Sequence, residues 1–226
     1  MRKFEKHIKA IIYGIGRFAE YVSYVISNDS KYEVVGFCID QKLIGSDSEF
    51  SGLPLVAFEQ VKEEFSPLDY EMFIAVGDNS IRAQKFQQAI DKGYSLLSYI
   101  SSKSNVWDDL KYGQNVFVSE DSTISPYVQI GDNSILIGVR VAHHSVIGKN
   151  SLLSGCLLGG SVVIGNNCFL GMQAVVKQGV SVADTNMIGM GCVIAKNTKD
   201  DEIYRVVNHT VKSPIPMSRF TTKLQS

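Results

Sequence analysis

The sequence predicts two fold classes in one chain, an α/β domain with a short parallel sheet followed by a parallel β-helix. Strand and helix patterns alternate through the first part of the chain, with glycine turns between them. From about residue 105 an aliphatic residue recurs at every sixth position, which fits neither an α-helix nor a sheet of long strands. We therefore expect domains at residues 1–104 and 105–204 and a tail at residues 205–226.

The α/β domain is predicted from apolar runs that end in turn residues. The expected strands are residues 7–13, 33–38 and 72–76, and the expected helices are residues 17–26 and 81–92. Gly14 and Gly16 lie between the first strand and the first helix, and Asp40 follows the second strand. Because strands and helices alternate, the sheet should be parallel.

The glycine turn matches a dinucleotide-binding motif only in part. Gly14 and Gly16 are followed by Ala19, and Asp40 has the spacing of a ribose-binding acid. A second half of a dinucleotide domain does not follow, which argues against an NAD-dependent enzyme. From spacing alone, a nucleotide site and a ligand-free scaffold are about equally supported.

The β-helix is predicted from two series of aliphatic residues. The first runs Val118, Ile124, Ile130 and Leu136, and the second runs Ile164, Leu170, Val176, Val182, Ile188 and Ile194. Between them lie Val141, Ile147, Leu153 and Leu158, where two steps are five residues long, so two coils should be one residue short. Gly, Asp and Asn often follow the aliphatic residue, which is turn chemistry at a fixed interval. We expect about three hexads per coil, with the aliphatic residues stacked inside.

Charge and cysteine usage exclude several function classes. Lys and Arg number 22 against 23 Asp and Glu, so no basic field would recruit nucleic acid or an anionic membrane. The apolar runs are too short to span a membrane, and residues 1–9 lack the apolar core of a secretory signal, so we expect a cytoplasmic protein. The four cysteines form no metal-ligand spacing, so we expect structural thiols and no metal. Cys168 and Cys192 fall at positions that suit interior corners of the β-helix.

The combined pattern resembles the bacterial nucleotide-sugar acyltransferases of the hexapeptide-repeat superfamily, which include sialic-acid O-acetyltransferases and bacillosamine or perosamine N-acetyltransferases. The segments that carry the resemblance are residues 12–19, 34–40, 75–79, 143–148 and 188–191. The resemblance implies a Rossmann-like first domain, a left-handed β-helix, and a homotrimer with active sites between subunits. It also implies two substrates, a nucleotide-linked amino sugar and acetyl-CoA or another acyl-CoA.

The resemblance also implies roles for individual residues. His143 matches the catalytic base, which removes a proton as an amine or hydroxyl attacks the thioester, and His144 beside it is a second candidate. The residues expected around the nucleotide sugar are Gly14, Gly16, Arg17, Asp40, Gly77, Asp78, Asn79 and Arg82. Those expected around acyl-CoA are Gly160, Gly171, Gly191 and Lys196, with Arg205 and Lys212 as further candidates for its phosphates.

Plain structural explanations compete with several of these roles. Each arginine is equally well explained as a solvated side chain, and glycine in a hexad is more commonly explained by turn geometry. The two histidines would then be polar residues on an outer coil face.

The chain departs from the family at the expected active site. His144 occupies a position that is usually acidic, Leu152 and Arg17 replace histidines, and the usual Gly-x-Pro-Ala ending is absent. These changes leave the orientation of His143 unexplained. They also leave open a longer acyl group than acetyl.

We predict an acyl-CoA-dependent N-acyltransferase that acts on a UDP- or dTDP-linked amino-deoxy sugar for a surface glycan such as an O-antigen. Alternatives are O-acetylation of a sugar hydroxyl and a catalytically silent nucleotide-sugar-binding subunit. A zinc β-helix enzyme like the γ-class carbonic anhydrases is disfavoured. His143 and His144 should point oppositely on a strand, with His7 and His209 remote from both.

Overall fold

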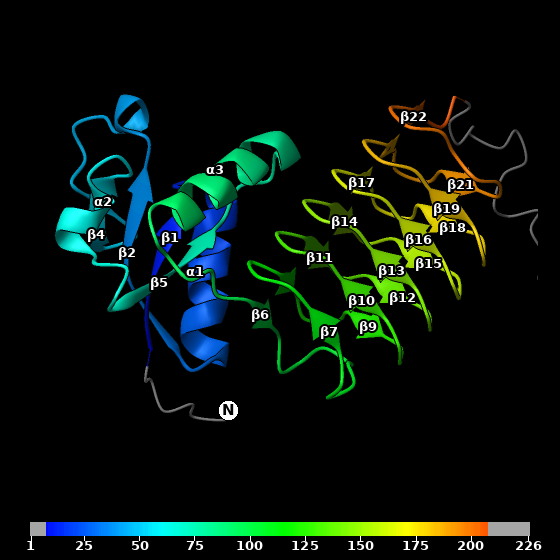
Figure 1. Cartoon of the computed structure of the whole chain (residues 1–226), viewed down its shortest axis with the longest axis horizontal. Helices are drawn as coiled ribbons and strands as arrows, with labels where there is room; N and C mark the ends of the chain where they lie inside the picture. Colours follow the sequence, from blue (N-terminus) through cyan, green and yellow to red (C-terminus); the bar gives the residue numbers. More distant parts are fainter. Residues whose placement is uncertain (1–7, 208–226) are drawn as a thin grey trace, which may run out of the picture.

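The computed structural model describes residues 8–207, which form an α/β domain and a coiled stack of short strands (Figure 1). The α/β domain contains β1 (Ile8–Tyr13), α1 (Arg17–Asp29), β2 (Tyr32–Ile39), the short 3₁₀ turn η1 (Gln41–Leu43), β3 (Glu49–Phe50), β4 (Leu53–Ala57), α2 (Val61–Glu64), β5 (Tyr70–Ile74) and α3 (Asn79–Asp91). Its strands form one sheet in the order β3-β4-β2-β1-β5, parallel except for the β3–β4 pair. The predicted strands and helices are confirmed to within a few residues.

The rest of the described chain winds through three parallel sheets. The first contains β7 (Lys111–Tyr112), β10 (Gln129–Ile130), β13 (Val146–Ile147), β16 (Val163–Ile164) and β19 (Ser181–Val182). The second contains β6 (Tyr99–Ile100), β8 (Phe117–Val118), β11 (Ile135–Ile137), β14 (Leu152–Ser154), β17 (Phe169–Leu170), β20 (Met187–Ile188) and β22 (Ile203–Tyr204). The third contains β9 (Thr123–Ile124), β12 (Arg140–Val141), β15 (Leu157–Leu158), β18 (Val175–Val176) and β21 (Val193–Ile194).

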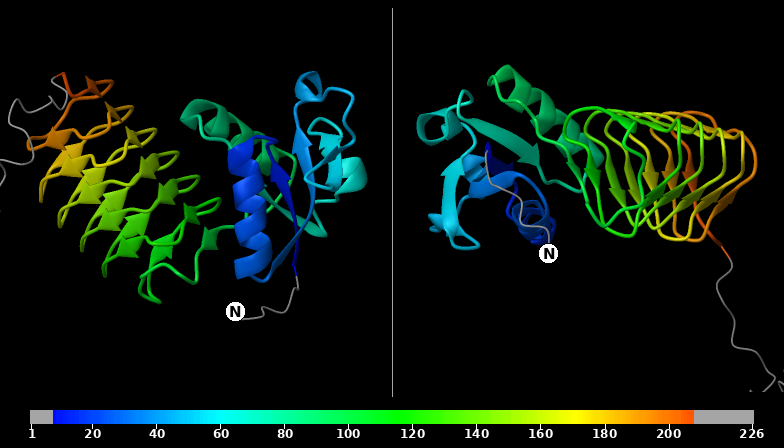
Figure 2. Two further views of the ribbon diagram at one scale, coloured as in Figure 1. Left: turned by 180° about the vertical axis from the view of Figure 1, so that it is seen from behind. Right: turned by 90° about the horizontal axis from the view of Figure 1, so that it is seen from below.

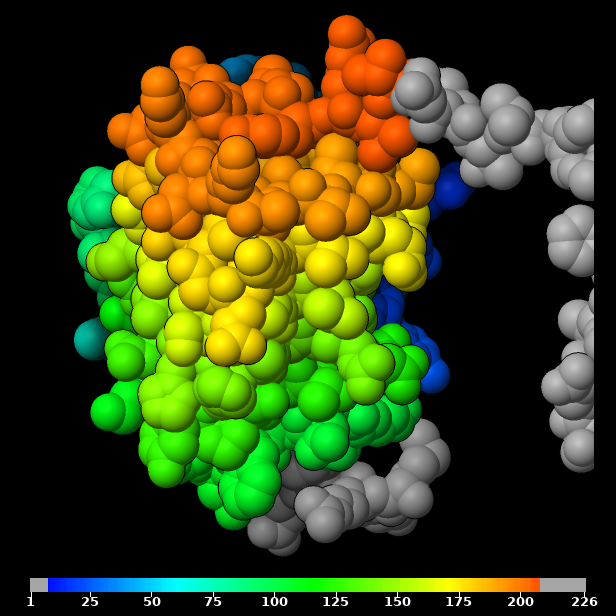
Figure 3. All heavy atoms as spheres, turned by 90° about the vertical axis from the view of Figure 1, so that its right-hand side faces the viewer, coloured from blue at the N-terminus to red at the C-terminus, as the bar shows by residue number. Residues whose placement is uncertain are grey.

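Each coil visits all three sheets, so the β-helix is a three-sided prism, and successive coils stack along its axis (Figure 2). In Figure 3 the coils follow one another as bands from green to orange. The predicted short coils are confirmed: Gln129 pairs with Val146 and Val146 with Val163, one residue less than the Val163–Ser181 step. At the two shortened turns Gly138 and Gly155 adopt φ of 56° and 54°, the left-handed region that glycine enters readily.

The aliphatic residue of every hexad from Val118 to Ile194 is buried, as predicted. Cys156, Cys168 and Cys192 are also buried inside the β-helix, and Cys38 is buried in the α/β domain. Burial raises the pKa of the Cys156 thiol to about 12. The cysteines are therefore packing residues, since a reactive cysteine needs an accessible thiolate.

The two domains share one core at the second sheet of the β-helix. Phe117 on β8 has ring contacts with Phe18, Tyr21, Phe73 and Tyr99, at centroid distances of 5.2–6.0 Å. Aromatic pairs at such distances stabilise beyond the area they bury. The β-helix begins with β6, a few residues before the predicted boundary at residue 105. The α/β domain is thus fixed to one side of the prism.

Candidate active site

His143 and His144 form the turn between β12 and β13, at the edge where the third sheet passes into the first. We call this edge the histidine corner. The expectation that the two side chains point oppositely on a strand is wrong. His144 has a left-handed φ of 58°, which turns its side chain toward His143, and the two Nδ1 atoms lie 3.0 Å apart. Both side chains are exposed.

Neighbouring coils hold the histidine corner from both sides. On the preceding coil, the ring of Tyr127 lies 4.6 Å from that of His144 between centroids. On the following coil, a Cβ added to Gly160 would lie 2.8 Å from Cε1 of His143, well inside van der Waals contact. Gly160 therefore makes room for the imidazole of His143. Its predicted place in an acyl-CoA groove stays a prediction.

The residues expected around acyl-CoA divide between two edges of the prism. Gly160 and Lys196 each follow a third-sheet strand by two residues, as His143 does, so all three belong to the histidine corner. Gly171 and Gly191 lie at the other edge of the third sheet, after β17 and β20. Arg205 is exposed beyond β22, and Lys212 lies outside the described residues.

A hollow of about 310 Å³ opens on the third sheet beside the histidine corner. Its lining includes Ala142 and Gly159, the residues just before His143 and Gly160. The other lining residues are Thr123, Ser125, Arg140, Val141, Leu157 and Leu158. Aliphatic and small side chains make up most of this lining, and Arg140 is its charged member.

The predicted glycines of the α/β domain differ in why they are glycine. Gly14 has φ of 128°, and an added Cβ would lie 2.9 Å from the carbonyl oxygen of Ala75, so the fold itself requires it. Gly16 and Gly77 have no atom within 4 Å of an added Cβ and ordinary φ values. Both are exposed at the carboxyl ends of β1 and β5, where ligands bind in open α/β sheets. Their open space suits an approaching ligand.

The start of α3 faces the β-helix of the same chain. Asp78 caps the helix: its Oδ1 accepts hydrogen bonds from the Ser80 hydroxyl at 2.6 Å and from the backbone N–H groups of Ile81 and Ser80 at 2.9 Å. These donors, the hydroxyl most of all, hold the pKa of Asp78 below its usual value. Asn79 donates to the carbonyl oxygen of Cys168 at 2.9 Å. A cavity of about 310 Å³ lies beside these residues, between the start of α3 and strands β17 and β20.

Arg82 is not a phosphate ligand, in contrast to the sequence-based prediction. Its side chain is fully buried, and its N–H groups donate to the carbonyl oxygens of Val76, Gly77, Asn133 and Asn150 and to Oδ1 of Asn79, at 2.7–3.1 Å. Burial lowers the pKa of Arg82 to about 10, so the guanidinium stays charged at neutral pH. Arg82 ties the two domains together. Arg17, by contrast, is exposed at the start of α1.

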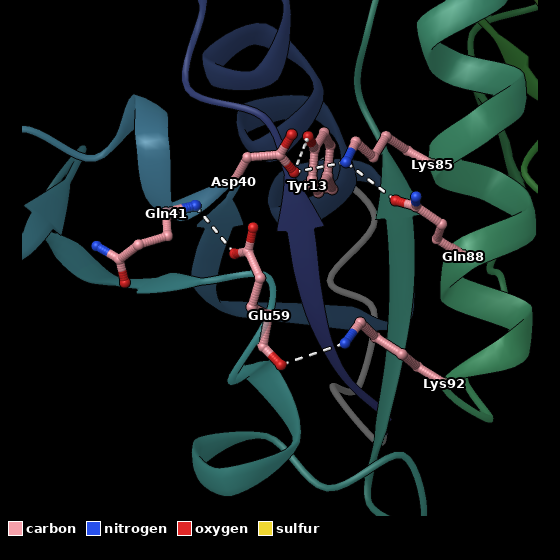
Figure 4. A network of polar contacts seen from close by, with 7 residues as sticks. All are labelled: Tyr13, Asp40, Gln41, Glu59, Lys85, Gln88 and Lys92. Carbon is pink, nitrogen blue, oxygen red and sulfur yellow. Dashed lines mark hydrogen bonds and ion pairs between the residues drawn. The ribbon is translucent and has the colours of Figure 1, made fainter.

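Asp40 lies in a polar network at the carboxyl end of β2 (Figure 4). Its Oδ1 accepts hydrogen bonds from Nζ of Lys85 at 2.6 Å and from the hydroxyl of Tyr13 at 2.9 Å. Burial opposes ionisation of Asp40, but these donors outweigh it and hold the pKa of the carboxyl below its usual value. Lys85 is a neighbour that sequence reasoning missed. It lies on the buried face of α3, one turn from Arg82 and Ala89.

Replacing Asp40 with asparagine should destabilise the α/β domain by about 3 kcal/mol at pH 7, because the buried ammonium of Lys85 loses its counter-charge. The folded pKa of Asp40 is depressed, so its contribution is present above the unfolded pKa and is lost as pH falls through the folded pKa. Urea unfolding should therefore separate the two proteins at pH 7 and less so near pH 3. A double variant, Asp40→Asn with Lys85→Met, should recover part of the loss.

Two further observations concern metals and membranes. Within residues 8–207, His, Cys, Asp and Glu side chains form no group of three that could hold a metal ion. His7 and His209 lie outside this range. Across the same residues, every helix is too short or too polar to cross a lipid bilayer.

Two family models match this chain, one in each of its domains. Residues 9–89 match the PglD N-terminal domain, and residues 161–196 match the bacterial transferase hexapeptide repeat. The acetyltransferase domain of PglB from Neisseria gonorrhoeae is similar in structure, with a TM-score of 0.79, 24% identity, and coverage of 87% of this chain and 96% of that one.

Two further solved structures are similar over both domains. PerB from Caulobacter crescentus, solved in complex with CoA and GDP-perosamine, has a TM-score of 0.75, 26% identity, and coverage of 86% and 92%. WeeI from Acinetobacter baumannii has a TM-score of 0.73, 20% identity, and coverage of 88% and 94%. The fold is therefore a Rossmann-like domain followed by a left-handed β-helix. The family matches in both domains, together with the similarity to PerB and to the PglB domain, support the resemblance of this chain to the nucleotide-sugar acyltransferases of the hexapeptide-repeat superfamily.

Proposed function

We propose that this protein transfers an acyl group, acetyl by default, from acyl-CoA to the amino group of a nucleotide-linked amino-deoxy sugar used in a surface glycan. The exposed His143 at the histidine corner, with the open hollow beside it, carries the proposal. PerB supports it, since that enzyme binds CoA and GDP-perosamine.

In the proposed reaction the neutral sugar amine attacks the thioester carbonyl carbon directly. Nε2 of His143 takes the proton that the nitrogen loses, and the tetrahedral intermediate collapses by breaking the carbon–sulfur bond. The CoA thiolate leaves and takes up a proton, and the amide remains on the sugar. The proposed transfer is direct, and an acyl-cysteine intermediate is not part of it, because all four cysteines are buried.

The site is proposed to form between subunits of a homotrimer. The α/β domain packs against the second sheet, through Phe117 and Ile135 in the shared core. The histidine corner joins the third sheet to the first, so it is the edge of the prism opposite the second sheet. A nucleotide sugar held at Gly16 and Gly77 therefore needs the histidine corner of another copy.

The test is release of CoA from acetyl-CoA with a panel of 3-amino and 4-amino sugars linked to UDP, dTDP and GDP, with product masses recorded. GDP is included because PerB binds GDP-perosamine, although the sequence favoured UDP or dTDP. An amide product on one sugar supports the proposal. An ester product would favour the O-acetyltransferase, and binding of a nucleotide sugar without turnover would favour the silent subunit.

Replacing Gly16 with leucine should leave stability unchanged and raise the KM for the nucleotide sugar at least tenfold. The fold leaves room for the new side chain, which would occupy the space proposed for the ligand. The measurements are Tm and steady-state kinetics. Gly14→Leu is the contrasting variant, since it should lower Tm through its φ and the contact with Ala75.

Gly16→Leu also tests the proposal that each active site is formed by two chains. When Gly16→Leu and His143→Asn proteins are unfolded and refolded together, mixed trimers would combine an intact nucleotide site from one chain with an intact histidine corner from another. Activity should then return to a sizeable fraction of wild type. If the mixture, assayed at a sugar concentration well below the KM of Gly16→Leu, is no more active than the two parents, both halves of the site lie in one chain.

A further inference from the structure

His143 and His144 share a hydrogen bond whose direction decides whether His143 can act as a base. We propose that His144 is a positioning residue that accepts a hydrogen bond from Nδ1–H of His143 and so leaves Nε2 of His143 free to take the substrate proton. The inference rests on the function proposed above and adds the device that orients its base.

The geometry allows one arrangement that suits catalysis. The Nδ1 atoms are 3.0 Å apart, so one of them carries the hydrogen and the other supplies a lone pair. If His143 donates, its Nε2 is unprotonated and can act as a base. If His144 donates, the proton of neutral His143 lies on Nε2, and the base is blocked. Catalysis thus requires His144 in the neutral tautomer with its proton on Nε2.

Backbone hydrogen bonds and side-chain contacts with the neighbouring coils hold both imidazole rings in place. The backbone N–H of His144 donates to the carbonyl oxygen of Pro126 at 3.2 Å, and that of Ser161 donates to the carbonyl oxygen of His143 at 2.8 Å. The Tyr127 ring covers His144, and Gly160 leaves space for His143. The coils on either side therefore hold the imidazoles at hydrogen-bond distance.

Within residues 8–207, the contacts that the two imidazoles and their backbone make with neighbouring coils are to uncharged residues. Tyr127 is its titratable neighbour on the preceding coil, and Gly160 and Ser161 face it from the following one. The nearest charged residues along the chain are Arg140 on β12 and Lys149 after β13. In the proposed arrangement the acceptor for His143 is thus an imidazole in place of a carboxylate. A carboxylate there would stabilise the protonated form of His143 more strongly.

Three substitutions at His144 separate positioning from other roles, and all tolerate its left-handed φ. Glycine removes the imidazole, asparagine supplies a neutral acceptor oxygen near the place of Nδ1, and aspartate supplies a charged one. We expect His144→Gly to lower kcat about 10- to 100-fold with KM changed less than threefold. His144→Asn should recover kcat to within about threefold of wild type.

His144→Asp should also recover kcat, but with the acid limb of its pH profile displaced to higher pH, since the carboxylate raises the affinity of His143 for its proton. Asp121→Gly is the matched control, because Asp121 is an exposed left-handed turn residue at another corner. It should keep wild-type kinetics. An unchanged kcat in His144→Gly, or a loss confined to KM, would overturn the proposal.

A readout independent of turnover distinguishes this inference from the proposed function. Nitrogen-15 NMR of the imidazoles, with His143 assigned through His143→Asn, reports which ring nitrogen carries the proton. Wild type should show His143 as the Nδ1–H tautomer, and His144→Gly should shift it toward Nε2–H. His143 found as Nε2–H in the wild type would refute the positioning role even if the enzyme is active.

Discussion

Replacing His143 with asparagine is expected to lower kcat about 10³-fold and to leave KM for both substrates within about threefold of wild type. The amide cannot take a proton from the attacking amine, and general bases contribute about 10²–10⁴-fold to such reactions. Asparagine is smaller than histidine and makes no clash over Gly160, so the corner should keep its shape. The measurement is steady-state CoA release with the sugar that proves active.

The controls separate loss of the base from loss of the site. Calorimetric titration should show that His143→Asn binds CoA and the nucleotide sugar as wild type does. The variant should also keep the Tm of wild type, because the side chain is exposed. A variant that retains full activity would remove His143 from its role. A loss confined to KM would make it a binding residue.

The β-helix could be predicted from sequence because its interior repeats. Aliphatic residues such as Ile164 and Leu170 occupy equivalent buried positions in successive turns of the β-helix. The same requirement for an apolar side chain therefore recurs along the chain at a fixed interval. The short coils were visible for the same reason, as steps of five in a series of six. Strands β3 and β4 were not predicted, because they are short and belong to no repeating sequence pattern.

The candidate site was less predictable because it depends on contacts between distant residues. The turn at His144 reverses the side-chain direction that a strand would give, and only backbone conformation reveals this. The sequence alone does not distinguish the roles of Gly14 and Gly16. In the structure a side chain at Gly14 would clash with the carbonyl oxygen of Ala75, whereas Gly16 faces open space. Lys85 reaches Asp40 across 45 residues of sequence, which no local pattern indicates.

Replacing Arg82 with methionine is expected to destabilise the protein by about 4 kcal/mol, the largest stability loss predicted for a single residue. Methionine fills much of the same volume but leaves buried carbonyl oxygens on both domains without donors. Tm should fall by about 10 °C. Arg82→Lys should lose most of the same stability, because an ammonium cannot reproduce the planar set of donors.

Gln84→Met is the matched control, since Gln84 is exposed on the same helix and should leave Tm within about 1 °C. Hydrogen exchange localises the effect: in Arg82→Met the amides of α3 should exchange faster, while those of β15 and β18 stay protected.

Replacing Arg82 with methionine should also weaken binding at the proposed nucleotide-sugar site. Arg82 donates to Oδ1 of Asn79, whose amide group donates to Cys168 of the β-helix. Loosening this chain of contacts should raise KM for the nucleotide sugar more than KM for acyl-CoA. Equal effects on both would mean that Arg82 stabilises the fold without holding the loop at Gly77 in place.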